Sequence, residues 1–340
     1  MSDLPTIPGF RPTRLLGTGS TARVYLARDA EGRRVALKVL LPAAERQDNP
    51  GAAEMFAGEV RMTLQLRHPH LVRGYSGQAY GEGAWLALEY FPDGSLDQQM
   101  MTGVPLPLEQ GARTLRGVAA GLDYMHAQGA VHQDVKTQNV YLDGGRAVLA
   151  DFGCSYMIGQ GGRAGGSPFY MAPEIYRGEG GTAASDVYSF GVLGYEVLAG
   201  QRPFRAESYE DLMGEHLLTA APALSHLNPQ VPRPLARLLQ RALAKAPADR
   251  PALGELLAAL DDVAGAEQVA PVPLPVARTE SGAQLGRHAA PTSAADGPAP
   301  ASVAQEASGA GEAASSAGAN NGATGLLSRW NPFRKKEGPA

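Results

Sequence analysis

The order in which two periodicities occur along this chain limits its fold most strongly. Runs typical of strands come first, at 24–27, 34–40 and 85–90. One helical pattern interrupts them at 53–66, and further helical patterns follow at 185–198, 234–244 and 253–263. Between these parts, four apolar residues recur at the spacing of an amphipathic helix: Leu115, Val118, Leu122 and Met125. Strands that precede helices predict an α+β protein with two segregated lobes.

The charge balance and the cysteine count argue against several classes of protein. The 340 residues include 30 basic and 34 acidic side chains, which argues against a global electrostatic grip on nucleic acid or an anionic membrane. Cys154 is the one cysteine, so neither an intrachain disulfide nor a cysteine-built zinc site can form. We expect a cytoplasmic protein that binds no nucleic acid. No apolar run reaches the roughly 18 to 20 residues that cross a bilayer, so we expect no transmembrane segment.

Composition divides the chain into an N-terminal extension at 1–9, a globular domain at 10–261 and a tail at 262–340. The tail is rich in Ala, Gly, Ser and Pro, and we expect it to be disordered because it buries too little apolar surface to offset the entropy of ordering. Residues 326–336 interleave apolar and basic side chains: Leu326, Leu327, Trp330 and Phe333 with Arg329, Arg334, Lys335 and Lys336. This end is a frayed terminus, a docking peptide for a partner, or a patch for an anionic membrane surface.

A glycine-containing segment at 17–24 follows one strand-like run and leads into the next. Gly17 and Gly19 would let a hairpin lie close over phosphate groups, with backbone N–H groups facing the anion. The segment is not a dinucleotide fingerprint, because no helix follows it, nor a Walker A loop, because no Gly-Lys-Ser/Thr closes it. Lys38 ends the next strand-like run, where an ammonium can reach the α- and β-phosphates of a nucleotide. An ordinary hairpin and an edge-strand lysine stay open as alternatives for these two features.

Three later motifs follow in a set order: His132-Gln133-Asp134-Val135-Lys136-Thr137-Gln138-Asn139, Asp151-Phe152-Gly153 and Ala172-Pro173-Glu174. Together with the glycine segment and Lys38, they resemble the motifs of eukaryotic-type (Hanks-type) Ser/Thr protein kinases, and most of all the bacterial branch. The resemblance covers about residues 10–260. It implies a bilobal fold, with a small β-rich N-lobe that contains one key helix and a larger α-helical C-lobe.

The resemblance also implies the reaction and the residues that serve it. ATP would bind with Mg²⁺, or with Mn²⁺ as the alternative ion. Asp134 would orient the acceptor hydroxyl and accept its proton, and Lys136 would contact the γ-phosphate. Asp151 and Asn139 would be metal ligands, since both supply hard oxygen atoms. Nucleotide binding would involve the following residues, with Glu59 holding Lys38: Gly17, Thr18, Gly19, Ser20, Ala22, Val24, Ala36, Lys38, Glu59, Leu88, Glu89 and Phe91.

Other positions are implied to be scaffold or depart from the pattern. Asp186 would begin a buried helix and bond back to the catalytic loop, and Arg250 would pair with Glu174. Gln133 stands where many regulated relatives have arginine, and a neutral amide cannot hold a phosphate through bidentate charged bonds. We therefore expect activity without phosphorylation of the activation segment. Ala22 replaces the third glycine, and we expect nucleotide binding to survive this change.

The function that these observations favour is a Ser/Thr protein kinase that phosphorylates protein substrates and itself. Lys136, two residues after Asp134, and the segment 166–170 resemble the Ser/Thr branch and not the Tyr branch. Two alternatives stay open: a nucleotide-binding pseudokinase scaffold and a kinase of a small molecule. The motif 172–174 and Arg250 argue against a small-molecule kinase, which normally lacks this segment.

Overall fold

The computed structural model describes residues 4–46, 51–157 and 166–265. The chain divides into two units, 1–270 and 271–340, and the second lies outside the described residues. An antiparallel sheet of five strands opens the first unit, in the order β1-β2-β3-β5-β4. Its strands are β1 (Arg11–Thr18), β2 (Ala22–Arg28), β3 (Arg34–Leu40), β4 (Gly74–Gln78) and β5 (Trp85–Glu89).

Alternation of side chains along β2 and β3 decides which face of the sheet is a core. Tyr25, Ala27, Val35, Leu37 and Val39 are all buried, and they form one cluster with Ile7. The residues between them, including Lys38, point to the opposite face because successive side chains of a strand alternate. Lys38 is thereby held on a strand whose other face is locked by packing.

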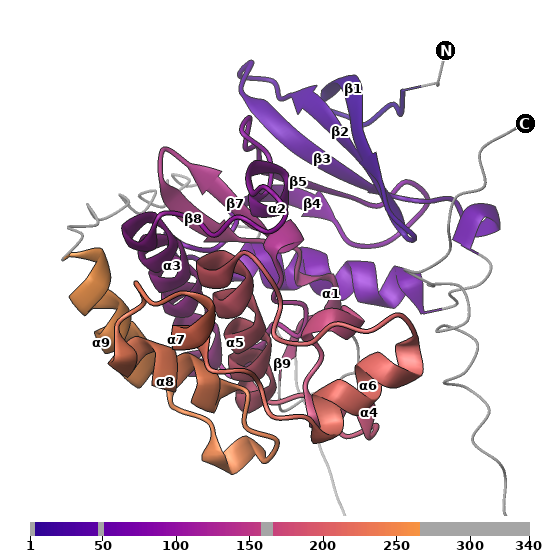
Figure 1. The fold of residues 1–340 in the computed structure, drawn as a ribbon. Helices are drawn as coiled ribbons and strands as arrows, with labels where there is room; N and C mark the ends of the chain where they lie inside the picture. Colours follow the sequence, from indigo (N-terminus) through magenta and orange to yellow (C-terminus); the bar gives the residue numbers. More distant parts are fainter. Residues whose placement is uncertain (1–3, 47–50, 158–165, 266–340) are drawn as a thin grey trace, which may run out of the picture. The chain divides into compact units, whose positions relative to one another are not determined.

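Helix α1 (Ala52–Gln65) packs on the sheet and lies below it in Figure 1. Phe56 and Val60 share a core cluster with Leu86 of β5, so one stripe of the helix faces the strands. Glu59 lies among these buried positions and is only 4% exposed. A carboxylate buried to this degree requires a partner, and this partner is described with the site.

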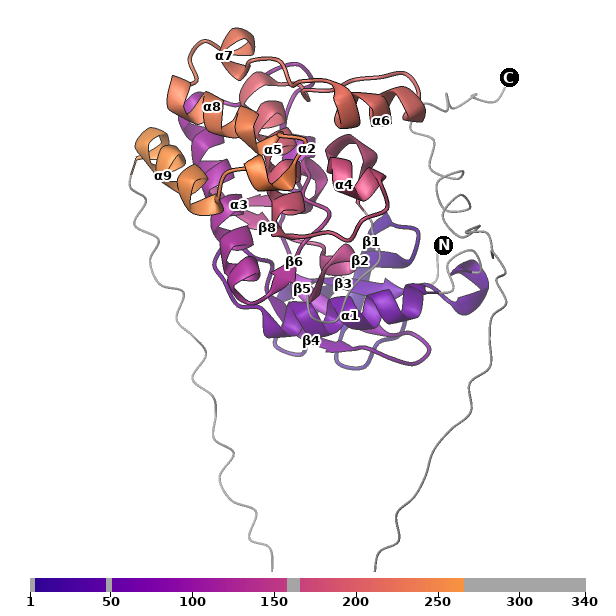
Figure 2. The same cartoon turned by 90° about the horizontal axis from the view of Figure 1, so that it is seen from below.

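The later part of the chain is mainly helical (Figure 2). Its helices are α2 (Leu96–Gln99), α3 (Leu108–Ala127), α4 (Pro173–Tyr176), α5 (Ala183–Ala199), α6 (Tyr209–Leu218), α7 (Leu224–Leu227), α8 (Arg233–Ala242) and α9 (Leu253–Ala264). The four apolar residues that predicted α3 are completely buried: Leu115, Val118, Leu122 and Met125. Helix α5 contacts both α3 and α8 and carries the large buried side chains Tyr188, Phe190 and Tyr195.

Two short strand pairs present the loops that carry the polar motifs. Strand β6 (Ala130–Val131) pairs with β9 (Tyr156–Met157), and β7 (Val140–Asp143) pairs with β8 (Arg146–Leu149). The loop 132–139 leaves β6, and the turn 151–154 follows β8. Gln133 and Asp151, one in each segment, are the only non-glycine residues with positive φ in the described part of the chain. Backbone strain of this kind is typical of functional sites.

The predicted α+β class and the two lobes are confirmed, and the strand and helix predictions hold with small changes at their ends. Strand β4 and the pairs β6–β9 and β7–β8 were not predicted, because strands of two to five residues are too short to show a clear alternation. Helix α9 continues to Ala264, beyond the boundary predicted at 261, because Leu260 and Ala264 remain buried. The rest of the predicted tail, including 326–336, lies outside the described residues. None of the helices in the described ranges is long and apolar enough to cross a membrane.

Candidate active site

Lys38 joins three separate segments of the chain. Its Nζ donates to Oε1 of Glu59 on α1 at 2.6 Å and to Oδ1 of Asp151 after β8 at 2.9 Å. The Lys38 and Glu59 side chains are 15% and 4% exposed, whereas that of Asp151 is 46% exposed. The predicted contact between Glu59 and Lys38 is therefore present, and the Asp151 carboxylate remains open to solvent on the other side of the lysine.

The charges in this network set one another's ionisation. Burial opposes the charged ammonium of Lys38, but the carboxylates of Asp151 and Glu59 outweigh burial and raise its pKa. The Lys38 ammonium lowers the pKa of Asp151 to about 2, and Lys136 adds to this effect. Burial raises the pKa of Glu59, and Lys38 opposes that rise. Lys38 and Asp151 are thus fully charged at neutral pH.

The loop after β6 brings Asp134, Lys136 and Asn139 together. Lys136 Nζ lies 2.6 Å from Oδ2 of Asp134. The Asn139 side-chain nitrogen donates to the backbone oxygen of Asp134 at 2.8 Å and to its Oδ2 at 3.0 Å. These bonds turn the amide oxygen of Asn139 away from Asp134. The residues expected to serve the acceptor and the metal therefore lie in one constellation.

Ser167 is a member of this constellation that sequence reasoning missed. Its backbone N–H and its hydroxyl both donate to Oδ1 of Asp134, each at 3.0 Å, and Lys136 Nζ donates to the hydroxyl oxygen at 2.8 Å. A serine hydroxyl thus sits within hydrogen-bond reach of the carboxylate and the ammonium that were assigned to an acceptor hydroxyl. The preceding Gly166 has φ +119°, and a Cβ there would lie 2.6 Å from the carbonyl oxygen of Gln133. Only glycine allows the backbone at 166 to come this close to Gln133. Gly166 was therefore the one sequence feature that indicated a contact between this segment and the loop 132–139.

Asp186, in the first turn of α5, holds the loop 132–139, called the catalytic loop below, through backbone N–H groups of that loop. Its carboxylate is completely buried and accepts from the N–H of His132 at 2.8 Å and of Gln133 at 2.7 Å. His126 Nε2 also lies 2.8 Å from it. The predicted bond from Asp186 back to the loop is present, and it holds the left-handed backbone of Gln133 next to Asp134.

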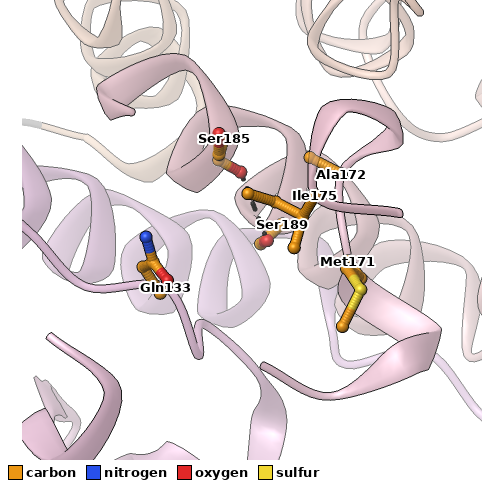
Figure 3. A pocket seen from close by; sticks show the side chains of 6 residues that line it. All are labelled: Gln133, Met171, Ala172, Ile175, Ser185 and Ser189. Atoms are coloured by element: carbon orange, nitrogen blue, oxygen red, sulfur yellow. Dashed lines mark hydrogen bonds between the residues drawn. The ribbon is translucent and has the colours of Figure 1, made fainter. Parts of the chain in front are cut away.

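Gln133 itself points into a small cavity, which Figure 3 shows. The cavity measures about 10 Å³, room for about one water molecule, and is lined by Gln133, Met171, Ala172, Ile175, Ser185 and Ser189. Both polar atoms of the Gln133 amide are buried and have no hydrogen-bond partner among the described residues. A Cβ on Gly181 would lie 1.9 Å from the amide nitrogen, so the chain leaves just enough space for this side chain.

A second ion pair lies among the helices. The Arg250 guanidinium donates to both carboxylate oxygens of Glu174, each at 2.7 Å, and the two side chains are 1% and 3% exposed. Ser185 donates to the same carboxylate at 2.6 Å. Burial works to raise the pKa of Glu174, but the hydrogen bonds from Arg250 and Ser185 lower it overall. The predicted contact between Arg250 and Glu174 is present.

Several of the residues expected to contact a nucleotide lie on the face of the sheet that carries Lys38, opposite the cluster of Tyr25 and Leu37. Val24 is the cross-strand partner of Lys38, and Ala36 is the partner of Leu88, which places these side chains on one face. The glycine segment is closed by a bond from Gly19 N–H to the Ala22 carbonyl oxygen at 2.8 Å. A Cβ on Gly17 would meet no described atom within 4 Å, so no contact among the described residues requires glycine at this position.

Three of the expected nucleotide residues have other neighbours. Ala22 is 3% exposed and belongs to the core cluster of α1. Glu89 forms an ion pair with Arg146 at 3.1 Å, and the buried ring of Phe91 stacks on that of Tyr141 with centroids 5.2 Å apart. Ala22 shares the sheet face of Lys38 but is packed against α1, whereas the side chains of Glu89 and Phe91 contact Arg146 and Tyr141 instead. Thr18 and Ser20 are exposed on the hairpin.

The donor set suits a hard divalent cation. Asp151 supplies an ionised, half-exposed carboxylate. The side-chain nitrogen of Asn139 donates to Asp134, which leaves the side-chain oxygen of Asn139 to act as a metal ligand. Carboxylate and amide oxygens are the ligands that Mg²⁺ uses, often one or two of them together with substrate phosphates. The described residues contain no group of three or more His, Cys, Asp or Glu that could hold a metal ion.

The fold and these contacts define a bilobal nucleotide-dependent enzyme class in which a strand lysine meets a helix glutamate. The model of the family described as "Protein kinase domain" matches residues 10–260, and this chain belongs to the protein kinase family. It is 33% identical over 269 residues to serine/threonine-protein kinase pkn2 of Myxococcus xanthus, which covers 74% of this chain and 32% of that protein.

Two relatives from Mycobacterium tuberculosis agree with this assignment. Serine/threonine-protein kinase PknA is 34% identical over 253 residues, which are 71% of this chain and 58% of PknA. Serine/threonine-protein kinase PknD is 35% identical over 272 residues, which are 76% of this chain and 40% of PknD. The matches thus span between about a third and three fifths of these relatives. The predicted resemblance to bacterial Hanks-type kinases is confirmed.

Proposed function

We propose that this chain is a Ser/Thr protein kinase that transfers the γ-phosphoryl group of ATP to hydroxyl groups of proteins, including its own. The observation that carries the proposal is the meeting of Lys38, Glu59 and Asp151 beside Asp134, Lys136 and Asn139. Phosphoryl transfer needs little covalent work from a protein, so catalysis depends on placing two substrates and neutralising charge. This constellation supplies fixed positive charge and acceptor oxygens for both tasks.

The first group of residues would hold the triphosphate. Lys38 has three N–H donors, of which two bind Glu59 and Asp151. The third has no acceptor in the described part of the chain and can donate to a phosphate oxygen. Asp151 and Asn139 would hold Mg²⁺, with Mn²⁺ as an alternative ion, and when bound the cation neutralises charge on the phosphates. Glu59 would keep Lys38 on the side of the sheet that faces the nucleotide.

The second group would serve the acceptor. Asp134 would accept the hydrogen bond of a Ser or Thr hydroxyl and take its proton as the oxygen attacks the γ-phosphorus. Lys136 would neutralise charge on the oxygens of the transferred group. The hydroxyl of Ser167 contacts both Asp134 and Lys136. It supports this placement because it is the same chemical group as the substrate hydroxyl that would receive the phosphate. A substrate hydroxyl would compete with it for the same carboxylate.

The proposal is tested by incubating the chain with labelled ATP, Mg²⁺ and two generic proteins, one basic and one acidic such as casein. We expect label in the chain and in at least one protein, and at least about 100-fold less for Asp151→Asn. Because the Asp151 side chain is half-exposed, this variant should fold as the natural chain does. Equal incorporation by both chains would refute the role of Asp151, and ATP binding without any transfer would indicate a pseudokinase.

The acceptor class is tested on the labelled product. Acid hydrolysis should release phosphoserine or phosphothreonine, and phosphotyrosine alone would contradict the Ser/Thr assignment. Protein freed of phosphate by a phosphatase should start without a lag, because the Gln133 amide cannot hold a phosphate as arginine does. A lag removed by autophosphorylation would contradict this second expectation and leave the kinase proposal intact. Localisation in the cytoplasm and a docking role for 326–336 stay predictions.

A further inference from the structure

The segment that touches Asp134 leads directly to a second arrangement of charge. Ser167 precedes the 3-10 helix Pro168–Tyr170, and Phe169 in this turn lies under a guanidinium. The Cζ atom of Arg202, from the loop after α5, lies 3.8 Å from the centre of the Phe169 ring. This distance is typical of a cation–π contact, and an arginine in such a contact can still use its N–H donors for a further partner.

The donors of Arg202 are largely unused. Its Nε lies 3.9 Å from Oε1 of Glu196, which is too long for a hydrogen bond, and its side chain is 31% exposed. In the described part of the chain, its N–H groups make no hydrogen bond. A guanidinium has five such donors in a planar fork that matches a carboxylate. Arg202 is therefore held in place but not saturated.

Glu196 is not equally free to bind a cation. Its Oε2 accepts the hydrogen bond of the Tyr170 hydroxyl, and its other oxygen faces Arg202. Burial raises the pKa of Glu196. Of the other charged groups that act on it, Asp97 raises this pKa and Arg205 lowers it. Of this ion pair, Arg202 is the more exposed member and the one whose donors make no hydrogen bond in the described part of the chain.

We infer that Arg202 selects substrates with an acidic side chain close to the phosphorylated residue, an inference that rests on the proposed function. The path from Asp134 through Ser167 and Phe169 to Arg202 is short, because a 3-10 helix rises only about 2 Å per residue. An extended peptide advances about 3.3 Å per residue, so the acidic residue stands within about five positions of the acceptor. Its carboxylate binds the free edge of the Arg202 fork.

The test is a set of peptides with one Ser acceptor, in which each position from five before to five after it is Glu, Ala or Arg in turn. For the natural chain we expect at least one position where kcat/KM is about tenfold higher with Glu than with Arg. Arg202→Ala should reduce this ratio to within about threefold, and Arg202→Glu should reverse it. Arg202→Lys should retain part of the preference, because it keeps the charge but loses the planar fork.

Arg237→Ala is the matched control, because Arg237 is an exposed arginine on α8. It should leave the preference unchanged, and melting temperatures identify any variant that fails to fold. The inference is wrong if the natural chain shows no Glu preference at any position, or if a folded Arg202→Ala variant keeps the tenfold ratio. These results leave the kinase proposal standing when casein or the peptides are labelled. Absence of label in every substrate and in the chain itself would refute the kinase proposal instead.

Discussion

Two ion pairs of this protein differ in how completely their hydrogen bonds are used. The five donors of Arg250 all have acceptors, on Glu174 and on the carbonyl oxygens of Ala184, Ala244 and Lys245. Among the described residues, Lys38 finds acceptors for two of its three donors, on Glu59 and Asp151. The first pair is wholly buried among helices, whereas Asp151 in the second is half-exposed. The saturated pair can only hold the fold, and the unsaturated one can also bind a ligand.

The same distinction separates the other charged groups. Asp186 is completely buried and holds the catalytic loop through two backbone N–H groups, so both of its carboxylate oxygens are hydrogen-bonded inside the protein. Lys136 and Asp134 bind each other and Ser167, a partner that a substrate hydroxyl can replace. Charged groups with exchangeable partners therefore gather at one place. This difference in saturation, and not burial alone, indicates where the chemistry is.

We expect the largest effect from breaking the saturated ion pair of Arg250 and Glu174. Arg250→Met leaves Glu174 buried without its cation, and removal of one partner of a buried pair costs about 3 to 5 kcal/mol. For a domain of this size we expect the melting temperature to fall by about 6 to 20 °C. Activity per folded molecule should be little changed, since Arg250 does not touch the Lys38 network. A variant that stays as stable as the natural chain but loses activity would reverse the comparison.

Breaking the unsaturated pair should have the opposite profile. Lys38→Met removes the ammonium between Glu59 and Asp151, and we expect kcat/KM to fall by about 100- to 1,000-fold. Stability should change less than in Arg250→Met, because the raised pKa of Glu59 lets this carboxyl take up a proton. Peptide kinetics and calorimetry on both variants measure the contrast. Equal loss of stability in the two variants would show that both pairs are structural.

Acid should separate the two pairs by pH. The pKa of Glu59 is raised above its ordinary 4.5, so this group is neutralised first and nucleotide binding should weaken while the fold persists. The pKa of Glu174 is lowered, so its contribution to stability is complete above pH 4.5 and is lost only as the pH falls through its lower folded value. Nucleotide binding and circular dichroism followed from pH 7 to 3 should give two transitions, with binding lost at the higher pH. Glu59→Gln should bind weakly at pH 7 and change little down to pH 5. Simultaneous loss of binding and fold would contradict this order.

The smallest effect concerns Cys154, which follows the turn of Asp151. Burial raises the pKa of this thiol to about 12, so the reactive thiolate is scarce at pH 7. Iodoacetamide at pH 7 should therefore leave activity within about twofold, and Cys154→Ala should behave alike. Rapid inactivation that is absent in Cys154→Ala would show that the open network includes a reactive thiol.

Much of the fold followed from local pattern, and the site less so. The apolar spacing of Leu115 and Leu122 predicted α3, because burial of one helix face requires this period, and the strand-like run 34–40 predicted β3. The contact of Glu59 with Lys38 came from the family resemblance, since the register of a helix against a sheet depends on packing. The roles of Ser167 and Arg202 were not predicted, because a single serine or arginine in a loop carries no periodicity.

The chain by itself determined which chemical groups are present, in which order they occur, and which segments become strands or helices. These properties depend on neighbours a few positions apart. Tertiary structure decided which charges are saturated and which remain available. Lys38 and Asp151 meet across 113 positions of sequence, and Arg250 reaches Glu174 across 76. Such contacts arise only when separate elements pack, and packing decides how many donors of each side chain find a partner.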